Sequence, residues 1–346
     1  MKRILNTTLR VAGKGTPKKQ LIVDRFGRTF NYLRLAVNEV CNLRCIYCMP
    51  ETGIDFKPKD KILSKSEIFK LLKITTDMGV SKIRFTGGEP LLRKDILDII
   101  KFAKNISTVK SIHLTTNGLL LSSMLNELED SGLTGVNISL DTLNSEKYKI
   151  ISRRDSLNEV MNSLNKAIEH NILKIKINVV AMRDFNDNEL ANFIGLTKKN
   201  NITVRFIELM PFDSHQIWKT GKFYKSKDII SDLKRKYKNL IIESGSSTEH
   251  HIFRVKGYRG KIAIIPSYTR SLCGQCNRIR ITADGNLLNC LYSQNEINLL
   301  TPIRNNCSDL ELKKIIKDGM FKKSKDGWEA HKKGIELRNS MTQIGG

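Results

Sequence analysis

Strand-like segments alternate with amphipathic helical segments along roughly the first two thirds of the chain. The strands are expected at residues 32–37, 82–86, 111–115, 136–140, 174–182 and 203–210. A capping-box pattern, Ser64-Lys65-Ser66-Glu67, opens one of the intervening helices, which carries the apolar positions Ile68, Leu71 and Leu72. Six β–α units in succession predict a parallel sheet or a partial barrel of class α/β.

Polar or glycine-bearing residues follow several of these strands. Gly87-Gly88-Glu89-Pro90 ends one strand, Thr116-Asn117-Gly118 ends the next, and Asp141 follows a third. Turns often contain such residues for backbone reasons alone. In barrels, however, the loops at the carboxyl ends of the strands build the active site. The series therefore predicts an active site at this edge of the sheet.

Composition restricts the classes of partner. Lys and Arg outnumber Asp and Glu by 59 to 35, giving a net charge of +24. The lysines are spread along the chain, which favours solvated helix faces over a nucleic-acid surface, so a nucleic-acid partner is not expected. We expect no membrane span, because no run of about 18 apolar residues occurs. Residues 1–20 are basic and lack the apolar core of a signal peptide, so we expect a flexible leader and a cytoplasmic protein.

The seven cysteines form two trios and one single residue. They are Cys41, Cys45 and Cys48; Cys273, Cys276 and Cys290; and Cys307. An odd number of cysteines in a chain without a secretion signal argues against a disulfide framework. Two trios predict two metal sites.

The first trio has the spacing Cys41-x3-Cys45-x2-Cys48. Thiolates are soft ligands that suit iron–sulfur clusters, and three of them leave one iron of a four-iron cube without a protein ligand. That iron can chelate S-adenosylmethionine (SAM). A zinc site would need a fourth ligand, and no Cys or His lies between Cys48 and His113. The trio therefore predicts a [4Fe–4S] cluster that binds SAM.

The second trio, Cys273-x2-Cys276-x13-Cys290, predicts a second cluster whose open iron contacts substrate. A structural zinc site with Cys307 as fourth ligand remains an alternative. Alternation along a strand would place Arg278 and Arg280 on one face, where they suit bidentate contacts to phosphate or a base edge. Two solvent-facing arginines on an edge strand are the simpler interpretation.

The spacing of the first trio, with an aromatic residue before its last cysteine, is the signature of the radical SAM superfamily. The chain from about Leu21 to Gly346 resembles the GTP 3′,8-cyclase (molybdenum cofactor biosynthesis protein A) family within it. The resemblance rests on the motifs at residues 32–35, 41–50, 83–93, 115–118, 139–141, 176–180 and 205–208, on the second trio with its Arg-x-Arg, and on the closing Ile344-Gly345-Gly346.

One segment differs from the family pattern. The family usually has Ser-Val-Thr-Asp-Arg before the first Cys-Asn, whereas this chain has Ala36-Val37-Asn38-Glu39-Val40. Glu39 keeps the acidic position in type, but the basic residue is missing. No role of that arginine carries over to this chain, while the cysteine ligands are unaffected.

The resemblance implies a partial (βα)6, TIM-like radical SAM barrel at residues 21–235 and a smaller α+β C-terminal extension at 236–346, which carries a second [4Fe–4S] cluster. It implies SAM contacts at four residues: Tyr47, Gly88, Ser139 and Met210. It implies GTP contacts at six: Arg34, Arg84, Thr115, Lys176, Arg278 and Arg280. Arg278, Arg280 and the terminal Gly345 and Gly346 are expected to serve catalysis, the glycines as a thin tail that enters the pocket.

The implied activity is that of a lyase in the first step of molybdenum cofactor biosynthesis. Reductive cleavage of SAM gives a 5′-deoxyadenosyl radical that takes the C3′ hydrogen of GTP. The C3′ radical adds to C8, and one more electron and a proton give 3′,8-cyclo-7,8-dihydro-GTP. The expected partners are a flavodoxin or ferredoxin-type electron donor, a downstream cyclic pyranopterin monophosphate synthase and a second copy in a homodimer. The alternatives are a peptide-modifying radical SAM maturase and a basic RNA-binding protein with two structural metal knots.

Overall fold

The computed structural model describes residues 21–170, 173–210, 222–245, 251–269, 273–293, 295–332 and 340–344. The predicted leader at 1–20 and the terminal Gly345 and Gly346 lie outside these residues. Among the residues described, no helix has the length and apolar character needed to cross a membrane.

Twelve strands in the described part of the chain form one sheet. They are β1 (Tyr32–Ala36), β2 (Lys82–Thr86), β3 (Ser111–Thr116), β4 (Gly135–Ser139), β5 (Lys174–Ala181), β6 (Thr203–Glu208), β7 (Leu240–Glu243), β8 (His251–Val255), β9 (Lys261–Ile265), β10 (Arg278–Ile281), β11 (Asn286–Leu288) and β12 (Ile297–Asn298). Their order across the sheet is β12-β11-β10-β1-β2-β3-β4-β5-β6-β9-β8-β7.

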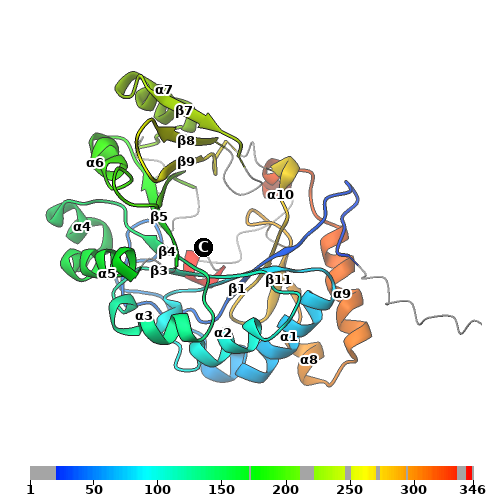
Figure 1. Cartoon of the computed structure of the whole chain (residues 1–346). Helices are drawn as coiled ribbons and strands as arrows, with labels where there is room; N and C mark the ends of the chain where they lie inside the picture. The colour runs from blue at the N-terminus through cyan, green and yellow to red at the C-terminus, as the bar shows by residue number, and fades with distance from the viewer. Residues whose placement is uncertain are drawn as a thin grey trace, which may run out of the picture.

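Helices lie along the outer side of this sheet, which bends into an open arc (Figure 1). They are α1 (Lys65–Asp77), α2 (Ile96–Lys104), α3 (Leu121–Asp130), α4 (Ser145–Ser152), α5 (Leu157–His170), α6 (Leu190–Gly195), α7 (Ser226–Lys236), α8 (Leu300–Arg304) and α9 (Asp309–Phe321). A further helix, α10 (Gly327–Lys332), lies at the open side of the arc. A short turn near the C-terminus, η6 (Met341–Gln343), lies on the inner side of the arc.

The six predicted strands form the centre of the sheet as β1–β6, all parallel to their neighbours. This confirms the predicted partial barrel of class α/β. The predicted capping box is also present, because Ser64 Oγ accepts from the Glu67 backbone at 3.3 Å and Glu67 accepts from the Ser64 backbone at 2.7 Å. Such a cap stabilises the start of α1 by about 1 kcal/mol.

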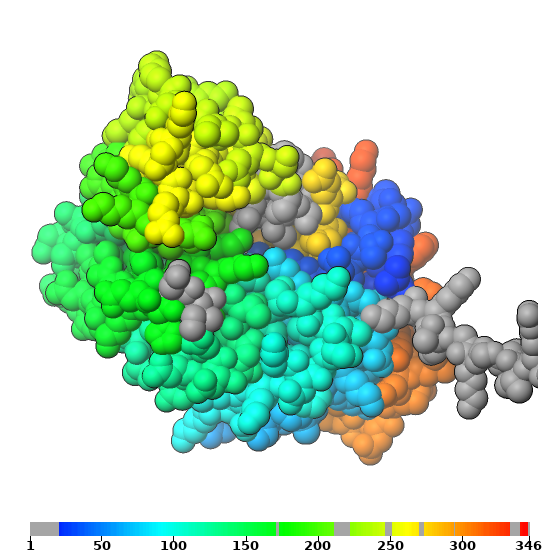
Figure 2. Space-filling model, in the orientation of Figure 1, coloured from blue at the N-terminus to red at the C-terminus, as the bar shows by residue number. Residues whose placement is uncertain are grey.

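The C-terminal part of the chain extends both edges of the same sheet. β9 pairs parallel to β6, and β10 pairs parallel to β1. The antiparallel strands β8 and β7 continue one edge, and β11 and β12 continue the other. Figure 2 shows the region of β7–β9, in yellow-green, at the top of the molecule, and the C-terminal helices α8 and α9, in orange, at its lower right. The division at residue 235 stays a prediction.

No strand was predicted across residues 222–260, but β7 and β8 are strands there. Among the described residues of this range, only α7 is helical. β7 is an edge strand with little burial, and Ile242 is 70% exposed. An exposed edge strand lacks the alternation of apolar and polar residues that marks a half-buried strand, so its sequence gave no strand signal.

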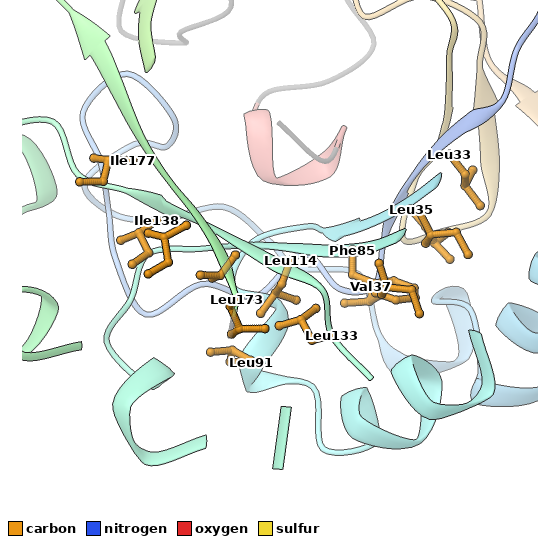
Figure 3. Packing of buried hydrophobic residues seen from close by; sticks show 14 of the residues in the cluster. Leu33, Leu35, Val37, Phe85, Leu91, Leu114, Leu133, Ile138, Leu173 and Ile177 are labelled. Atoms are coloured by element: carbon orange, nitrogen blue, oxygen red, sulfur yellow. The ribbon is translucent and has the colours of Figure 1, made fainter. Parts of the chain in front are cut away.

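Alternation along the central strands separates an apolar face from a polar one. Leu33 and Leu35 of β1 and Phe85 of β2 are buried and point toward the helices, away from η6 (Figure 3). Because successive side chains point to opposite faces, Arg34 and Arg84 face the inside of the arc. The apolar core thus lies between sheet and helices, and the inner face is left for binding.

Candidate functional site: two cysteine-lined cavities

The first trio lines one cavity of about 220 Å³ on the inner side of the sheet. The loop that carries it is held by α4, since the backbone N–H groups of Arg44 and Ile46 donate to Ser152 and Ile151. Burial and the neighbouring Cys41 raise the pKa of Cys48 to about 12. Three cysteine side chains that line one cavity fit a three-cysteine cluster.

The Gly-Gly-Glu-Pro turn holds the start of this loop. The Gly88 backbone donates to Asn38 O at 3.1 Å, and the Glu89 backbone donates to Val40 O at 2.8 Å. A Cβ atom at Gly88 would lie 2.2 Å from Val40 O. The glycine is therefore required by backbone packing. Its predicted purpose, to leave room for the amino acid part of SAM, remains a prediction.

Replacing Gly88 with alanine is expected to push the backbone before Cys41 away from the turn. We expect a loss of about 2 kcal/mol in the free energy of unfolding, as for other overpacked sites, and less iron bound at the first trio. Thermal unfolding and iron analysis measure both effects. Gly195→Ala is the matched control, because its Cβ would meet no atom within 4 Å. Equal behaviour of the two variants would contradict this assignment.

All four predicted SAM residues line the same cavity as the first trio. They are Tyr47, Gly88, Ser139 and Met210. Tyr47 Oη donates to Asp141 Oδ2 at 2.6 Å, and Asp141 Oδ1 accepts from the Val180 backbone at 2.8 Å. Burial raises the pKa of Asp141 to about 6. Asp141, noticed in the sequence only as a strand-end signal, fixes the aromatic ring beside the cysteines.

A buried carboxylate connects the ends of β2 and β3 to the cysteine loop. Glu89 accepts from Thr116 Oγ1 at 2.9 Å and from the Asn117 backbone at 2.7 Å. Burial raises its pKa to about 7 despite these hydrogen bonds. Asn117 Nδ2 in turn donates to Asn42 Oδ1 at 2.7 Å. The strand-end motifs of the sequence thus form one network around the first trio.

The segment that departs from the family pattern lies at the edge of this network. Glu39 is 2% exposed, and its carboxylate accepts from the Lys57 backbone at 3.3 Å. Val40, where the family carries a basic residue, is 44% exposed. The acidic residue at position 39 is therefore used inside the fold, while a cation at position 40 would stand at the surface.

The second trio lines a smaller cavity of about 70 Å³, together with Arg278 and Arg280. Met210 lines this cavity as well as the first, so the two sites adjoin. Although burial alone would raise the pKa of Cys276, Arg278 and Lys323 lower it to about 6. Cys276 is therefore poised as a thiolate, the form that binds metal.

Lys323 is a member of this second site that the sequence analysis missed. Its side chain is buried, its Nζ donates to the Asn289 carbonyl oxygen, and it lies 5.6 Å from the centre of the Phe30 ring. Burying a lysine is costly unless a negative charge lies nearby, and the cysteine thiolates meet that need. No local pattern distinguishes Lys323 from the many surface lysines.

Cys307 lies away from the second trio. It packs against the main hydrophobic core, and its carbonyl accepts from Lys70 Nζ at 3.0 Å. The zinc alternative therefore lacks its proposed fourth ligand. Among the described residues, no three His, Cys, Asp or Glu side chains converge closely enough to hold a single metal ion. Ligands of a four-iron cube bind separate irons and need not converge on one point.

The six predicted GTP residues lie on neighbouring strands of the inner face: Arg34 on β1, Arg84 on β2, Thr115 on β3, Lys176 on β5, and Arg278 and Arg280 on β10. Arg34 stands beside Arg84 on one side and beside Arg280 on the other in the sheet register. Arg84 and Arg280 are each 4% exposed. The structure thus places Arg280, Arg34 and Arg84 in one row across the sheet, while Lys176 stands further along the strands, in register with Thr115.

The inner face carries a strong positive potential. Burial, together with Arg34 and Arg278, holds the pKa of Arg280 well below its usual value. Burial would raise the pKa of Tyr32, yet nearby cations lower it to about 7; they are Arg84, Arg34, Lys82 and Arg205. Both shifts show that positive charge is crowded here. A polyanion bound against this face would relieve that crowding.

Three further inner-face residues were missed: Tyr32, Lys82 and Arg205. Arg205 Nη2 donates to Asn137 Oδ1 at 2.7 Å. The signal that could have found two of them was present, because Tyr32 precedes Arg34 by two positions and Lys82 precedes Arg84 by two. Residues two apart on a strand share a face.

Comparison with known proteins gives consistent matches. The sequence model of the radical SAM superfamily matches residues 35–197, and that of the molybdenum cofactor synthesis C-terminal domain matches residues 202–328. A GTP 3′,8-cyclase of Chlorobaculum tepidum is 42% identical over 95% of this chain and 98% of its own. A GTP 3′,8-cyclase of Desulforamulus reducens is 39% identical over 94% of this chain and 100% of its own. SuiB of Streptococcus suis, solved with S-adenosylmethionine, shares the fold with a TM-score of 0.57, at 16% identity over 86% of this chain and 66% of its own.

Proposed function

The chain belongs to the GTP 3′,8-cyclase family of the radical SAM superfamily, and from this premise we propose that it converts GTP to 3′,8-cyclo-7,8-dihydro-GTP. Two cysteine-lined cavities that share Met210, beside a cationic inner face, carry the proposal. Such an arrangement would set a radical source next to a site for a nucleoside triphosphate. The reaction would be the lyase step that opens molybdenum cofactor biosynthesis.

The first cavity would hold a [4Fe–4S] cluster on Cys41, Cys45 and Cys48, with SAM on its open iron. When bound, the cluster and SAM supply the one-electron cleavage that generates a carbon radical. The protein holds Tyr47 in place through Asp141 and builds the cavity wall from Gly88, Ser139 and Met210. Its contribution is orientation and exclusion of water.

The second cavity would hold a second [4Fe–4S] cluster on Cys273, Cys276 and Cys290. Two cations, the half-buried Arg278 and the buried Lys323, adjoin the trio and favour the thiolate form of Cys276. A cluster here would lie at the end of the cationic row, where the guanine of a bound GTP could reach an open iron. Its role would be to hold the base, while the arginines fix the phosphates.

The row of cations on the inner face would bind the triphosphate. Arg34, Arg84 and Lys176 lie on strands β1, β2 and β5, and Thr115 adds a hydroxyl from β3. The Thr115 hydroxyl is buried with no hydrogen-bond partner among the described residues, so a ligand atom would satisfy it. A crowded, buried set of cations favours a compact polyanion over the peptide expected by the maturase alternative.

The C-terminal glycines are predicted to act after the radical has formed. Ile344, the last described residue, is buried. Met341 and Thr342, which line the first cavity, come three and two residues before it. We expect a chain truncated after Ile344 to form 5′-deoxyadenosine but not the cyclised product. Chromatography of both compounds from one reaction checks this. If the truncated chain still makes cyclised product, the glycines are a frayed end.

We also propose the cellular setting that the family implies. The enzyme would be cytoplasmic and homodimeric, would receive electrons from a flavodoxin or ferredoxin-type donor, and would supply its product to a cyclic pyranopterin monophosphate synthase.

Anaerobic iron and sulfide analysis tests whether the two proposed clusters are present. Two cubes require about eight iron atoms per chain, four in each. About four would remove the second cluster from the proposal, and zinc in place of iron would favour the RNA-binding alternative.

A further inference from the structure

The chain's last described residues dock on the loop of the first trio. Ser340 Oγ donates to the Cys48 carbonyl oxygen at 2.8 Å, and the Met341 backbone N–H donates to the same oxygen at 3.3 Å. The two partners are 292 positions apart in the sequence. We call residues 340–344 the C-terminal turn; its helical part, η6, lies inside the arc of the sheet (Figures 1 and 3).

One hydroxyl organises the C-terminal turn. Besides bonding to Cys48, Ser340 Oγ accepts from the Thr342 backbone at 3.2 Å and lies 2.9 Å from Thr342 Oγ1. The backbone N–H of Gln343 donates to Ser340 O at 3.2 Å. Ser340 is 3% exposed. Without its hydroxyl, the turn would lose both its internal cap and a link to the cysteine loop.

The docked turn forms part of the cavity wall. Met341 and Thr342 line the cavity of about 220 Å³ together with the first trio and Tyr47. The wall of this cavity therefore includes residues close to the C-terminus as well as the cysteine loop. Met341 presents a flexible apolar side chain, a type that fills irregular gaps against a ligand.

We propose that Ser340 is a positioning residue that seats Met341 and Thr342 against SAM, so that the C-terminal turn is a wall of the SAM site. This rests on the proposed function, in that SAM must bind at the first trio. The turn then acts one step earlier than the terminal glycines, since it affects SAM binding before any radical forms.

The test is the affinity of the reconstituted, anaerobic protein for SAM, measured by equilibrium dialysis without reductant. Ser340→Ala removes the hydroxyl, and we expect roughly fivefold weaker SAM binding, the worth of one neutral hydrogen bond. Met341→Ala leaves the hydroxyl in place and removes only the apolar wall, and we expect a similar loss. Iron content is expected to stay unchanged in both, which a general folding defect would not allow.

The control is Ser123→Ala on α3, where the hydroxyl makes the same kind of bond, to Leu120 O at 3.0 Å, at an exposed site. Its SAM affinity is expected to equal that of the unmodified chain. If Met341→Ala and Ser340→Ala also bind SAM as the unmodified chain does, the inference is overturned while the proposed function stands. If Ser340→Ala does not fold, Met341→Ala decides alone. If the unmodified chain binds no SAM, the proposed function fails first.

Discussion

Replacing Cys41 with serine is expected to reduce 5′-deoxyadenosine formation to the background seen without protein. The Cys41 sulfur accepts from the Leu43 backbone at 3.5 Å and lines the first cavity with Cys45 and Cys48. Serine has nearly the same shape, so the loop should keep its fold, but its hydroxyl is a poor iron ligand at neutral pH. The first cluster would therefore be lost and with it the source of the radical.

Iron analysis separates this loss from a general defect. The second trio is untouched by the change, so iron should fall from about eight to about four atoms per chain. Cys307→Ser is the matched control, because Cys307 packs against the apolar core and lines neither cavity. That control should keep full iron and full activity. Normal turnover by Cys41→Ser would sink the assignment of the first site.

Replacing Arg280 with methionine is expected to weaken GTP binding by about 10- to 100-fold, the worth of a charge-assisted hydrogen bond to phosphate or base. The same change is expected to stabilise the ligand-free protein. Burial and the nearby Arg34 and Arg278 hold the pKa of Arg280 well below its usual value, which means that its charge is unfavourable in the folded state. An apolar side chain of similar volume removes that penalty.

The two expected effects of Arg280→Met have opposite signs, because GTP binding becomes weaker while the ligand-free protein becomes more stable. GTP affinity is measured by calorimetry on the anaerobic protein, and stability by thermal unfolding without ligand. Arg235→Met is the control, since the Arg235 side chain is 80% exposed on α7 and removing it should leave GTP affinity unchanged. If Arg280→Met binds GTP with unchanged affinity, Arg280 does not contact the nucleotide. If it lowers ligand-free stability, its charge has a structural role.

The sequence predicted the centre of the fold because half-buried strands and capped helices carry local signals. β2 begins and ends at the predicted residues, and the capping box at Ser64 formed as expected. β7 was missed because it is an exposed edge strand without a buried apolar face. Placement of the C-terminal strands on both edges of one sheet depends on long-range pairing, which local patterns do not contain.

The candidate site divides in the same way. The trios and the strand-end turns were visible because their members are close in sequence, and the structure gathers the predicted SAM residues in one cavity. Lys323 and Ser340 could not be predicted as site residues, because each is far in sequence from the cysteines that it lies beside. Gly88 is a third case. The sequence singled it out as a SAM contact, but the structure shows that the nearby backbone of Val40 leaves no room for a side chain there, a contact that the sequence does not reveal.

The central claim is that this chain takes a hydrogen atom from C3′ of GTP, and GTP deuterated at C3′ tests it most directly. The anaerobic, reconstituted protein is mixed with SAM, a reductant and the deuterated GTP, and the 5′-deoxyadenosine formed is examined by mass spectrometry. The account predicts one deuterium in 5′-deoxyadenosine, together with a cyclised nucleotide that has lost the label. Unlabelled 5′-deoxyadenosine, with GTP recovered unchanged, would contradict it.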